Sequence, residues 1–519
     1  MNRKLPIGIQ DFESIRRDDY IYVDKTEYIY NLIQNGKPYF LSRPRRFGKS
    51  LLLSTMRAYF EGKRELFKGL AIEDLSKDDA SAFAPCPVFY FDFNRTNFKE
   101  DNALEAVLNE HLKVWENQYE ISVSDEPLSA RFQNLIVKAA TDKNNVVVLV
   151  DEYDKPLLEA DDELLEHNKA VFKGFFSTLK SYDHYLKFVF LTGVTKFSKV
   201  SIFSDLNHLQ DISIDRRYDG ICGITEEELR ESFAPEISDM ADEYDISVDE
   251  CLERLKNMYD GYHFHHKGVG VYNPFSLINA FAKKEFGSYW FETGTPTFLV
   301  DRLKNIDIDI KEFTDGSLYA EESELKDYRS DNPNPIPLLY QTGYLTIVDY
   351  DDESRYYGLG YPNQEVRYGF LKSLAPMVLH REKEARPLDL RSFLNDIKHA
   401  EIDSFMNRFV ALYANIPYVN DEKETESNFQ NVIYIVFMLL GQFVKTEVHN
   451  ATGRADVIVE TNEYIFIFEF KRDKSAKEAL DQIEDKGYAA PYAADKRRLY
   501  KIGVNFVTEN RSIDEWIYV

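Results

Sequence analysis

The sequence predicts an α/β fold whose N-terminal part is built on a doubly wound parallel sheet. Three observations predict it. A Gly-Lys-Ser loop stands between a strand-like and a helix-like segment, a β-branched run ends in two carboxylates, and strand patterns alternate with helix patterns over residues 1–222. That alternation is typical of a parallel sheet covered by helices on both faces.

The Gly-Lys-Ser loop joins the strand-like pair Phe40-Leu41 to Leu51, where a helix-like run begins. It has the form of the second half of a phosphate-binding P-loop. Gly48 lets the backbone approach an anion closely, and the amides at the helix start point toward it. In this arrangement Lys49 reaches the β- and γ-phosphates, and the Ser50 hydroxyl ligates Mg²⁺. The loop therefore predicts binding of ATP with Mg²⁺.

One position of the loop departs from the P-loop pattern. The pattern has a glycine five residues before Gly48, where this sequence has Arg43. The alternative is a basic loop ahead of a helix, with no nucleotide bound. On the nucleotide interpretation, seven consecutive residues are predicted to contact the ligand: Arg45, Arg46, Phe47, Gly48, Lys49, Ser50 and Leu51.

A second motif favours the nucleotide interpretation. The run Val146–Val150 is mostly β-branched, which is typical of a strand buried on both faces, and it ends in Asp151 and Glu152. Ligands bind at the carboxyl ends of such strands. We predict that Asp151 holds the Mg²⁺ shell and that Glu152 polarises the attacking water. The alternative is an ordinary strand that ends in a solvated acidic turn.

The remaining elements of this part follow from local patterns. Thr192 lies at the end of another buried strand, where its hydroxyl either reads the γ-phosphate or satisfies a turn. The other predicted elements are helices at Glu27–Asn35, from the loop to about Glu61, at Ala103–Ala140 and at Leu164–Ser181, and a strand at Val88–Phe93.

Length and pattern changes predict four domains, which is a usual number for 519 residues. They are an ATPase-type domain at 1–222, a helical and aromatic region at 223–330, a linker with a helix and hairpin at 331–394, and a C-terminal domain at 395–519. The helix and hairpin suggest a winged-helix-like module. Its acidic tip, Asp351–Glu353, favours protein contact over DNA binding.

Composition limits the partners and the compartment. The net charge of -26 argues against a broadly basic surface for nucleic acid. Any DNA contact is therefore expected at local patches, of which the best is Lys496, Arg497, Arg498 and Lys501. No apolar run approaches the roughly 20 residues that span a bilayer, and the N-terminus lacks a signal-peptide core. Three widely spaced cysteines favour a reducing compartment, so we predict a cytoplasmic protein without a membrane partner.

The C-terminal domain carries a second set of polar residues. Glu426 lies near the start of an apolar helix, and two strand patterns follow at Gly453–Val459 and Tyr464–Lys471. Because side chains alternate across a strand, Glu469 and Lys471 share one face of the second strand. This places two opposite charges on one face of an otherwise apolar run.

These residues predict a phosphodiester-cleaving site. Asp456 on the neighbouring strand can meet Glu469 around one divalent cation, and Mg²⁺ prefers such oxygen ligands. A bound water of lowered pKa would attack the phosphodiester, with Lys471 orienting it or offsetting the charge that develops. Gln482 on the following helix is expected to contribute. The alternative is a surface ion pair between Glu469 and Lys471, which is common and contributes little.

The chain resembles, over nearly its whole length, the bacterial AAA-ATPase-like proteins with a C-terminal PD-(D/E)XK nuclease-superfamily domain that are abundant in gut Bacteroidetes. The matching segments include Tyr22–Thr26, Arg43–Ser50, Asp151–Asp154, Thr192–Lys196, Tyr259–Tyr262, Gly453–Asp456, Glu469–Lys471 and Ala479–Ile483. The resemblance implies an AAA-like ATPase domain, a helical lid, a winged-helix-like region and a restriction-endonuclease-like fold. Its nuclease core, carried over, is Glu426, Asp456, Glu469 and Lys471.

Two functions stay open at this point. The first is an ATP-regulated, Mg²⁺-dependent DNA endonuclease, with defence against foreign DNA as an association drawn from the family alone. The second is a nucleotide-dependent switch or assembly module whose C-terminal fold only binds nucleic acid or a partner. A homo-oligomer is open as well, and Arg216 and Arg217 are the candidates for an arginine finger.

Overall fold

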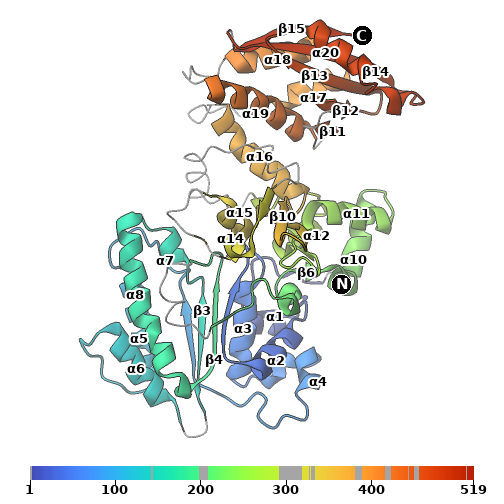
Figure 1. Ribbon diagram of the computed structural model, residues 1–519. Helices are drawn as coiled ribbons and strands as arrows, with labels where there is room; N and C mark the ends of the chain where they lie inside the picture. Colours follow the sequence, from blue (N-terminus) through green and yellow to red (C-terminus); the bar gives the residue numbers. More distant parts are fainter. Residues whose placement is uncertain are drawn as a thin grey trace. The chain divides into compact units, whose positions relative to one another are not determined.

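A computed structural model describes residues 3–141, 144–197, 209–291, 318–326, 328, 334–379, 388–414, 422–441, 444–448, 455–509 and 511–519 (Figure 1). The chain forms two compact units. The first comprises residues 1–302 and 319–365, and the second comprises residues 303–318 and 366–519. The finer boundaries at 222/223, 330/331 and 394/395 stay predictions.

The first unit contains the predicted parallel sheet. Its strands are β1 (Pro38–Ser42), β2 (Val88–Asp92), β3 (Val146–Asp151), β4 (Leu186–Gly193) and β5 (Gln210–Asp211). They lie in the order β2-β3-β4-β1-β5, and every pair is parallel. All six residues of β3 are buried, as its β-branched composition predicts. Because β4 lies between β1 and β3, the Gly-Lys-Ser loop and Asp151 emerge on either side of one strand.

Helices cover both faces of this sheet, which confirms the doubly wound class. Figure 1 shows α2, α3 and α4 on one side and α5, α6 and α8 on the other. The helices of this region are α1 (Phe12–Arg17), α2 (Thr26–Asn35), α3 (Lys49–Phe60), α4 (Ala71–Leu75), α5 (Ala103–Gln118), α6 (Leu128–Ala139), α7 (Lys155–Leu158) and α8 (Asp162–Ser181).

The continuous helical stretch predicted for Ala103–Ala140 is wrong in its middle. Helix α5 ends at Gln118 and α6 begins at Leu128. Glu120 adopts a left-handed backbone with φ 55°, which a helix does not accommodate. Pro127, which precedes α6, has no N–H to donate to a continuing helix.

The rest of the first unit is mainly helical. It contains α10 (Glu226–Glu243), α11 (Val248–Tyr259) and α12 (Pro274–Lys283), with the two-stranded sheet of β6 (Ile224–Thr225) and β7 (Val271–Tyr272). These helices share an apolar core that includes Leu229, Phe233, Leu255, Tyr259 and Leu277. Helix α10 begins with a reciprocal capping box between Thr225 and Glu228, which satisfies two N–H groups at its start.

The predicted helix and hairpin follow. Helix α14 (Glu322–Lys326) precedes α15 (Ile336–Thr342), and the antiparallel strands β9 (Thr346–Asp351) and β10 (Tyr356–Gly360) come next. Strand β8 (Leu318–Ala320) completes a three-stranded sheet in the order β8-β10-β9.

The second unit is a mixed sheet with helices. Helix α16 (Gln364–Val378) leads into α17 (Leu390–Lys398), α18 (Ile402–Ala414) and α19 (Glu422–Leu440). Strands β11 (Lys445–Val448), β12 (Val457–Glu460), β13 (Tyr464–Arg472), β14 (Arg498–Val507) and β15 (Ser512–Tyr518) lie in sequence order. Only β13 and β14 are parallel, and α20 (Ala476–Asp485) makes the crossover that a parallel pair requires.

Within the described residues, no helix combines the length and the hydrophobicity that crossing a bilayer requires. The second unit instead buries its apolar side chains internally. Phe405, Phe437 and Phe468, from α18, α19 and β13, pack with ring centroids 5.1–5.8 Å apart.

Substitutions at two separate glycines, Gly261 and Gly174, test how closely the backbone of the first unit is packed. Gly261 has φ +97°, and a Cβ there would lie 2.0 Å from the Pro362 carbonyl oxygen. Gly261→Ala should therefore lower the free energy of unfolding by about 1–3 kcal/mol or more. Gly174 lies at an exposed position in the middle of α8, where a Cβ would meet nothing within 4 Å. Gly174→Ala should therefore raise the free energy of unfolding by up to about 1 kcal/mol.

Denaturant unfolding of the two variants measures both changes. Equal stability of the two variants would contradict this account of the Gly261 turn.

Candidate nucleotide and nuclease sites

The P-loop connects the end of β1 to the first turn of α3. Gly48 precedes the helix in a left-handed conformation with φ 91°, which glycine adopts without steric cost. Arg46 is also left-handed, with φ 67°. No hydrogen bond from the backbone N–H groups of residues 45–48 occurs among the described residues. Unpaired amides in a loop at a helix N-terminus form an anion-binding arrangement.

Lys49 is held inside this loop. Its side chain is buried, and its ammonium donates to the carbonyl oxygens of Arg43 at 2.9 Å and Pro44 at 3.0 Å. A phosphate would offer the ammonium a stronger, charged acceptor than a carbonyl. Ser50 and Leu51 follow in the first turn of α3, both half-buried.

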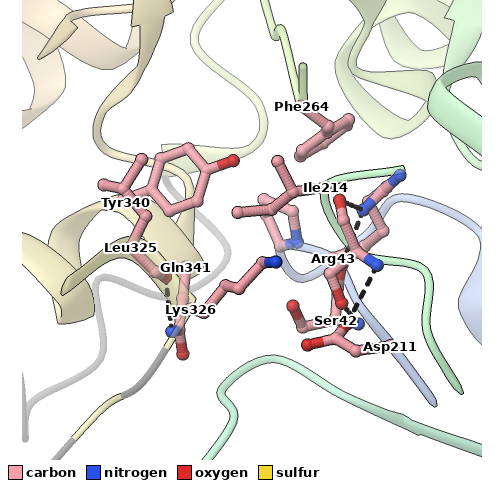
Figure 2. Close-up of a pocket in the computed structure, with 11 residues that line it drawn as sticks. Ser42, Arg43, Asp211, Ile214, Phe264, Leu325, Lys326, Tyr340 and Gln341 are labelled. Atoms are coloured by element: carbon pink, nitrogen blue, oxygen red, sulfur yellow. Dashed lines mark hydrogen bonds between the residues drawn. The ribbon is translucent and has the colours of Figure 1, made fainter. Parts of the chain in front are cut away.

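Arg43 replaces the first glycine of the P-loop pattern, and its side chain is 1% exposed. The guanidinium donates to the carbonyl oxygens of Ser42 at 2.9 Å, Ser213 at 2.7 Å and Tyr218 at 3.1 Å. It also lies 3.8 Å from the ring centroid of Phe264 (Figure 2). Burial lowers the pKa of Arg43. Arg43, a departure from the general P-loop pattern that belongs to the family-like segment Arg43–Ser50, thus fastens the loop to the segment after β5.

Other loop residues contact segments far along the chain. The Phe47 side chain is 1% exposed and packs on Tyr262 and Phe264, with centroids 4.7 and 6.0 Å away. Its ring is therefore committed to packing, and only its backbone is left to face a ligand. The exposed Arg46 has its guanidinium 4.8 Å from the Phe275 ring centroid. Arg45 is exposed as well.

Asp151 at the end of β3 and Asp154 beyond it are buried and Glu152 is half-buried, so the alternative of a solvated turn is wrong. Asp151 is 3% exposed and accepts hydrogen bonds from the hydroxyls of Thr192 at 2.8 Å and Tyr90 at 3.2 Å. Thr192 is thus tied to a carboxylate at the sheet edge. Asp154 accepts from the N–H groups of Val194 and Thr195, which fixes the turn after β3 to the end of β4.

Glu152 combines an uncommon backbone conformation with a raised pKa. Its backbone is left-handed with φ 51°, a conformation in which non-glycine residues are uncommon. Burial raises the pKa of Glu152, the positive charge of Lys49 lowers it, and the charges of Asp151 and Asp154 raise it further. A carboxylate with a raised pKa is a better proton acceptor for an attacking water.

In the second unit, four predicted residues lie together. Glu469 on β13 accepts from the Lys471 ammonium at 2.9 Å and from the Gln482 side-chain amide of α20, both at Oε1. Asp456 accepts from the N–H of Phe470 at 2.8 Å, which puts it next to Glu469. Glu469 is 2% exposed, so the alternative of a surface ion pair is wrong.

The fold of this unit explains why Gln482 reaches the site. Gly503 on β14 is the register partner of Glu469, and a Cβ there would lie 2.2 Å from the Ala476 carbonyl oxygen. The missing side chain lets α20 lie directly against the sheet. On the opposite face of β13, Phe468 and Phe470 stack with centroids 6.2 Å apart, as strand alternation predicts.

One oxygen of this site has no partner among the described residues. Glu469 Oε2 is buried and makes no hydrogen bond to any of them. Such an atom costs free energy unless a cation or donor satisfies it. The described residues contain no group of three or more acidic, histidine or cysteine side chains placed to bind a metal, but Mg²⁺ commonly uses one or two carboxylates and keeps its waters.

Some predicted positions lie outside the description. Glu426 belongs to α19 by its backbone, and its side chain is outside the described part, as are Gly453 and Arg454. Two residues of the predicted cationic patch form ion pairs. Arg497 pairs with both Glu460 and Asp495, whereas Lys501 pairs with Glu484. Arg217 likewise pairs with Asp215. These ion pairs reduce the charge left for a phosphate backbone.

Two family models match the chain. Residues 6–203 match the family model described as predicted AAA-ATPase, and residues 424–516 match the PD-(D/E)XK nuclease superfamily. The "Uncharacterized protein in vnfD 5'region" of Azotobacter chroococcum mcd 1 is 38% identical over 526 residues, covering 98% of each chain.

The crystal structure of Cdc6p from Pyrobaculum aerophilum aligns with 72% of this chain and 99% of its own, at 12% identity and a TM-score of 0.24. A likeness this weak supports no conclusion. The two family matches and the relative that covers 98% of the chain show the family. The chain belongs to the AAA-ATPase-like proteins that carry a C-terminal PD-(D/E)XK nuclease-superfamily domain.

Proposed function

We propose that this protein binds and hydrolyses ATP with Mg²⁺ in its first unit and cuts DNA with Mg²⁺ in its second, under control of the nucleotide. The observation that carries the nuclease part is the buried Oε2 of Glu469, which has no partner in the described part of the chain and lies next to Asp456 and Lys471. Membership of the family supports an ATPase domain coupled to a nuclease-type domain.

The nucleotide part rests on three features at one edge of the sheet. The amides of residues 45–48 make no hydrogen bond within the described chain, Lys49 is held beside them, and Asp151 is bonded to Thr192. In such a site Lys49 and the amides bind the phosphates, and Ser50 with Asp151 would hold Mg²⁺. Glu152 would take the proton of the attacking water. Arg45 and Arg46, both exposed, would contact phosphate.

The nuclease part fits a single hydrated Mg²⁺. Asp456 and Glu469 would supply the carboxylate oxygens, and the metal, when bound, lowers the pKa of a water that attacks phosphorus. Lys471 would then stabilise negative charge on the phosphate, while Gln482 keeps Glu469 in position. Glu426 is proposed for the same site from the family pattern.

A specific observation also favours a second candidate. Ion pairs occupy Arg497 and Lys501, two of the four residues of the predicted cationic patch, and the net charge of -26 opposes DNA binding. A nucleotide-dependent switch or assembly module, whose nuclease-type domain only binds a partner or nucleic acid, has no need of free positive charge. Metal-dependent cutting separates the two candidates, because a binding module retains DNA without cutting it.

The deciding experiment incubates the protein with supercoiled, linear and single-stranded DNA and with Mg²⁺ or Mn²⁺, with and without ATP. We expect metal-dependent cutting that responds to ATP. Absence of cutting under every condition, with ATP still bound, would favour the switch.

Replacing the P-loop lysine tests the nucleotide site. Lys49→Ala removes a charge-assisted donor to phosphate, so the Kd for Mg-ATP should rise about 10- to 100-fold, as calorimetric titration would measure. Lys138→Ala, at an exposed position of α6 in the same unit, serves as the control and should leave the Kd unchanged. Equal affinity of the two variants would refute the assignment of Lys49.

Replacing the buried carboxylate tests the nuclease site. Glu469→Gln keeps the shape and removes the charge, so the rate of DNA cutting should fall by about a hundredfold or more, while ATP binding is unchanged. Lys471→Ala should have the same effect. Glu463→Gln, on the exposed turn before β13, makes the same chemical change outside the site and should cut normally. Full cutting by Glu469→Gln would sink the nuclease assignment.

A further inference from the structure

A tryptophan from a distant part of the chain holds the P-loop backbone. The indole N–H of Trp290 donates to the carbonyl oxygen of Arg45 at 3.0 Å, across 245 positions of sequence. Trp290 is 7% exposed, and its ring packs against Tyr344 with centroids 5.3 Å apart. The tryptophan is thus a fixed donor and not a surface side chain that meets the loop by chance.

A buried carboxylate fixes the tryptophan in turn. Glu365 Oε1 accepts from the backbone N–H of Trp290 at 2.7 Å, and Oε2 accepts from the Ser276 hydroxyl at 2.7 Å. Glu365 is 2% exposed, and its pKa is raised to about 7 because burial outweighs the hydrogen bonds that lower it. One backbone amide and one hydroxyl therefore hold the two oxygens of this buried carboxylate.

Trp290 holds the peptide unit between Arg45 and Arg46, whose N–H belongs to the anion-binding amides of the P-loop. The peptide unit between Arg45 and Arg46 is planar and trans, so its N–H points away from its carbonyl oxygen. Fixing the oxygen of Arg45 fixes the direction of the Arg46 N–H, one of the amides left without a partner in the described chain. Because residues 43–47 contain no glycine, the contact holds a loop in which Arg46 is left-handed.

We call the two hydrogen bonds that connect Glu365, Trp290 and the Arg45 carbonyl oxygen the relay. From this relay we infer that Trp290 and Glu365 are positioning residues of the nucleotide site. Glu365 orients Trp290, and Trp290 holds the Arg45–Arg46 peptide so that its N–H faces a phosphate. The inference rests on the proposed nucleotide binding by the P-loop. It assigns a function to two residues outside every motif recognised in the sequence.

Trp290→Phe tests the relay, because it removes the indole donor and keeps an aromatic ring. The Kd for Mg-ATP should rise about 3- to 10-fold, the effect of losing one hydrogen bond. The matched control is Trp516→Phe in the second unit, which also removes an indole hydrogen bond, to Asp403 at 2.8 Å, and should leave the Kd unchanged. Glu365→Gln should weaken binding in the same direction as Trp290→Phe. Thermal unfolding of each variant confirms that folded proteins are compared.

A second measurement uses the tryptophan as its own reporter. The chain has three tryptophans, so the double variant Trp115→Phe/Trp516→Phe leaves Trp290 alone. Saturating Mg-ATP should shift or quench its emission, a readout that a purely structural role would not produce. This measurement also covers the case in which Trp290→Phe fails to fold.

The outcomes are distinguishable. If the wild type binds Mg-ATP while Trp290→Phe binds equally well, or while the emission of Trp290 does not change, the relay is overturned and the proposed function stands. If the wild type binds no nucleotide and Lys49→Ala behaves alike, the proposed function fails and takes the relay with it.

Discussion

The buried guanidinium of Arg43 fixes the shape of the P-loop. A charged group at 1% exposure is costly unless it is compensated. Here three carbonyl oxygens accept hydrogen bonds from the two terminal nitrogens and an aromatic face lies against the guanidinium, while Nε makes no hydrogen bond among the described residues. The planar fork of arginine joins β1 to the segment between Ser213 and Tyr218 in a way that glycine could not. The P-loop has arginine in place of its first glycine, and hydrogen bonds to Ser213 and Tyr218 hold the loop in its conformation.

The same principle extends along the loop. Gly343 lies so close to Pro44 that a Cβ there would be 2.7 Å from the proline ring, and Phe47 lies against Tyr262. The P-loop thus contacts the segments that follow the sheet, and its shape depends on their packing. Through the Trp290 indole it is also tied to Glu365, the second residue of α16, the helix through which the chain continues into the second unit.

The second unit uses burial differently. Its central carboxylate, Glu469, has one oxygen hydrogen-bonded to Lys471 and Gln482, while the other finds no partner among the residues that the structure describes. A fully satisfied network would rigidify the fold, whereas a half-satisfied one is unfavourable unless a ligand completes it. The apolar stack on the opposite face of β13 supplies the stability that allows this.

Local spacing was enough to predict the parallel sheet, the P-loop at Gly48, the acidic end of β3 and the shared face of Glu469 and Lys471. Glycine conformation and the two-residue period of a strand act over a few residues, so they are visible in the sequence. The buried position of Arg43, the packing of Phe47 and the hydrogen bond from Trp290 to Arg45 depend instead on long-range packing. Such contacts join residues up to 245 positions apart, and the packing that selects them leaves no periodic trace in the sequence.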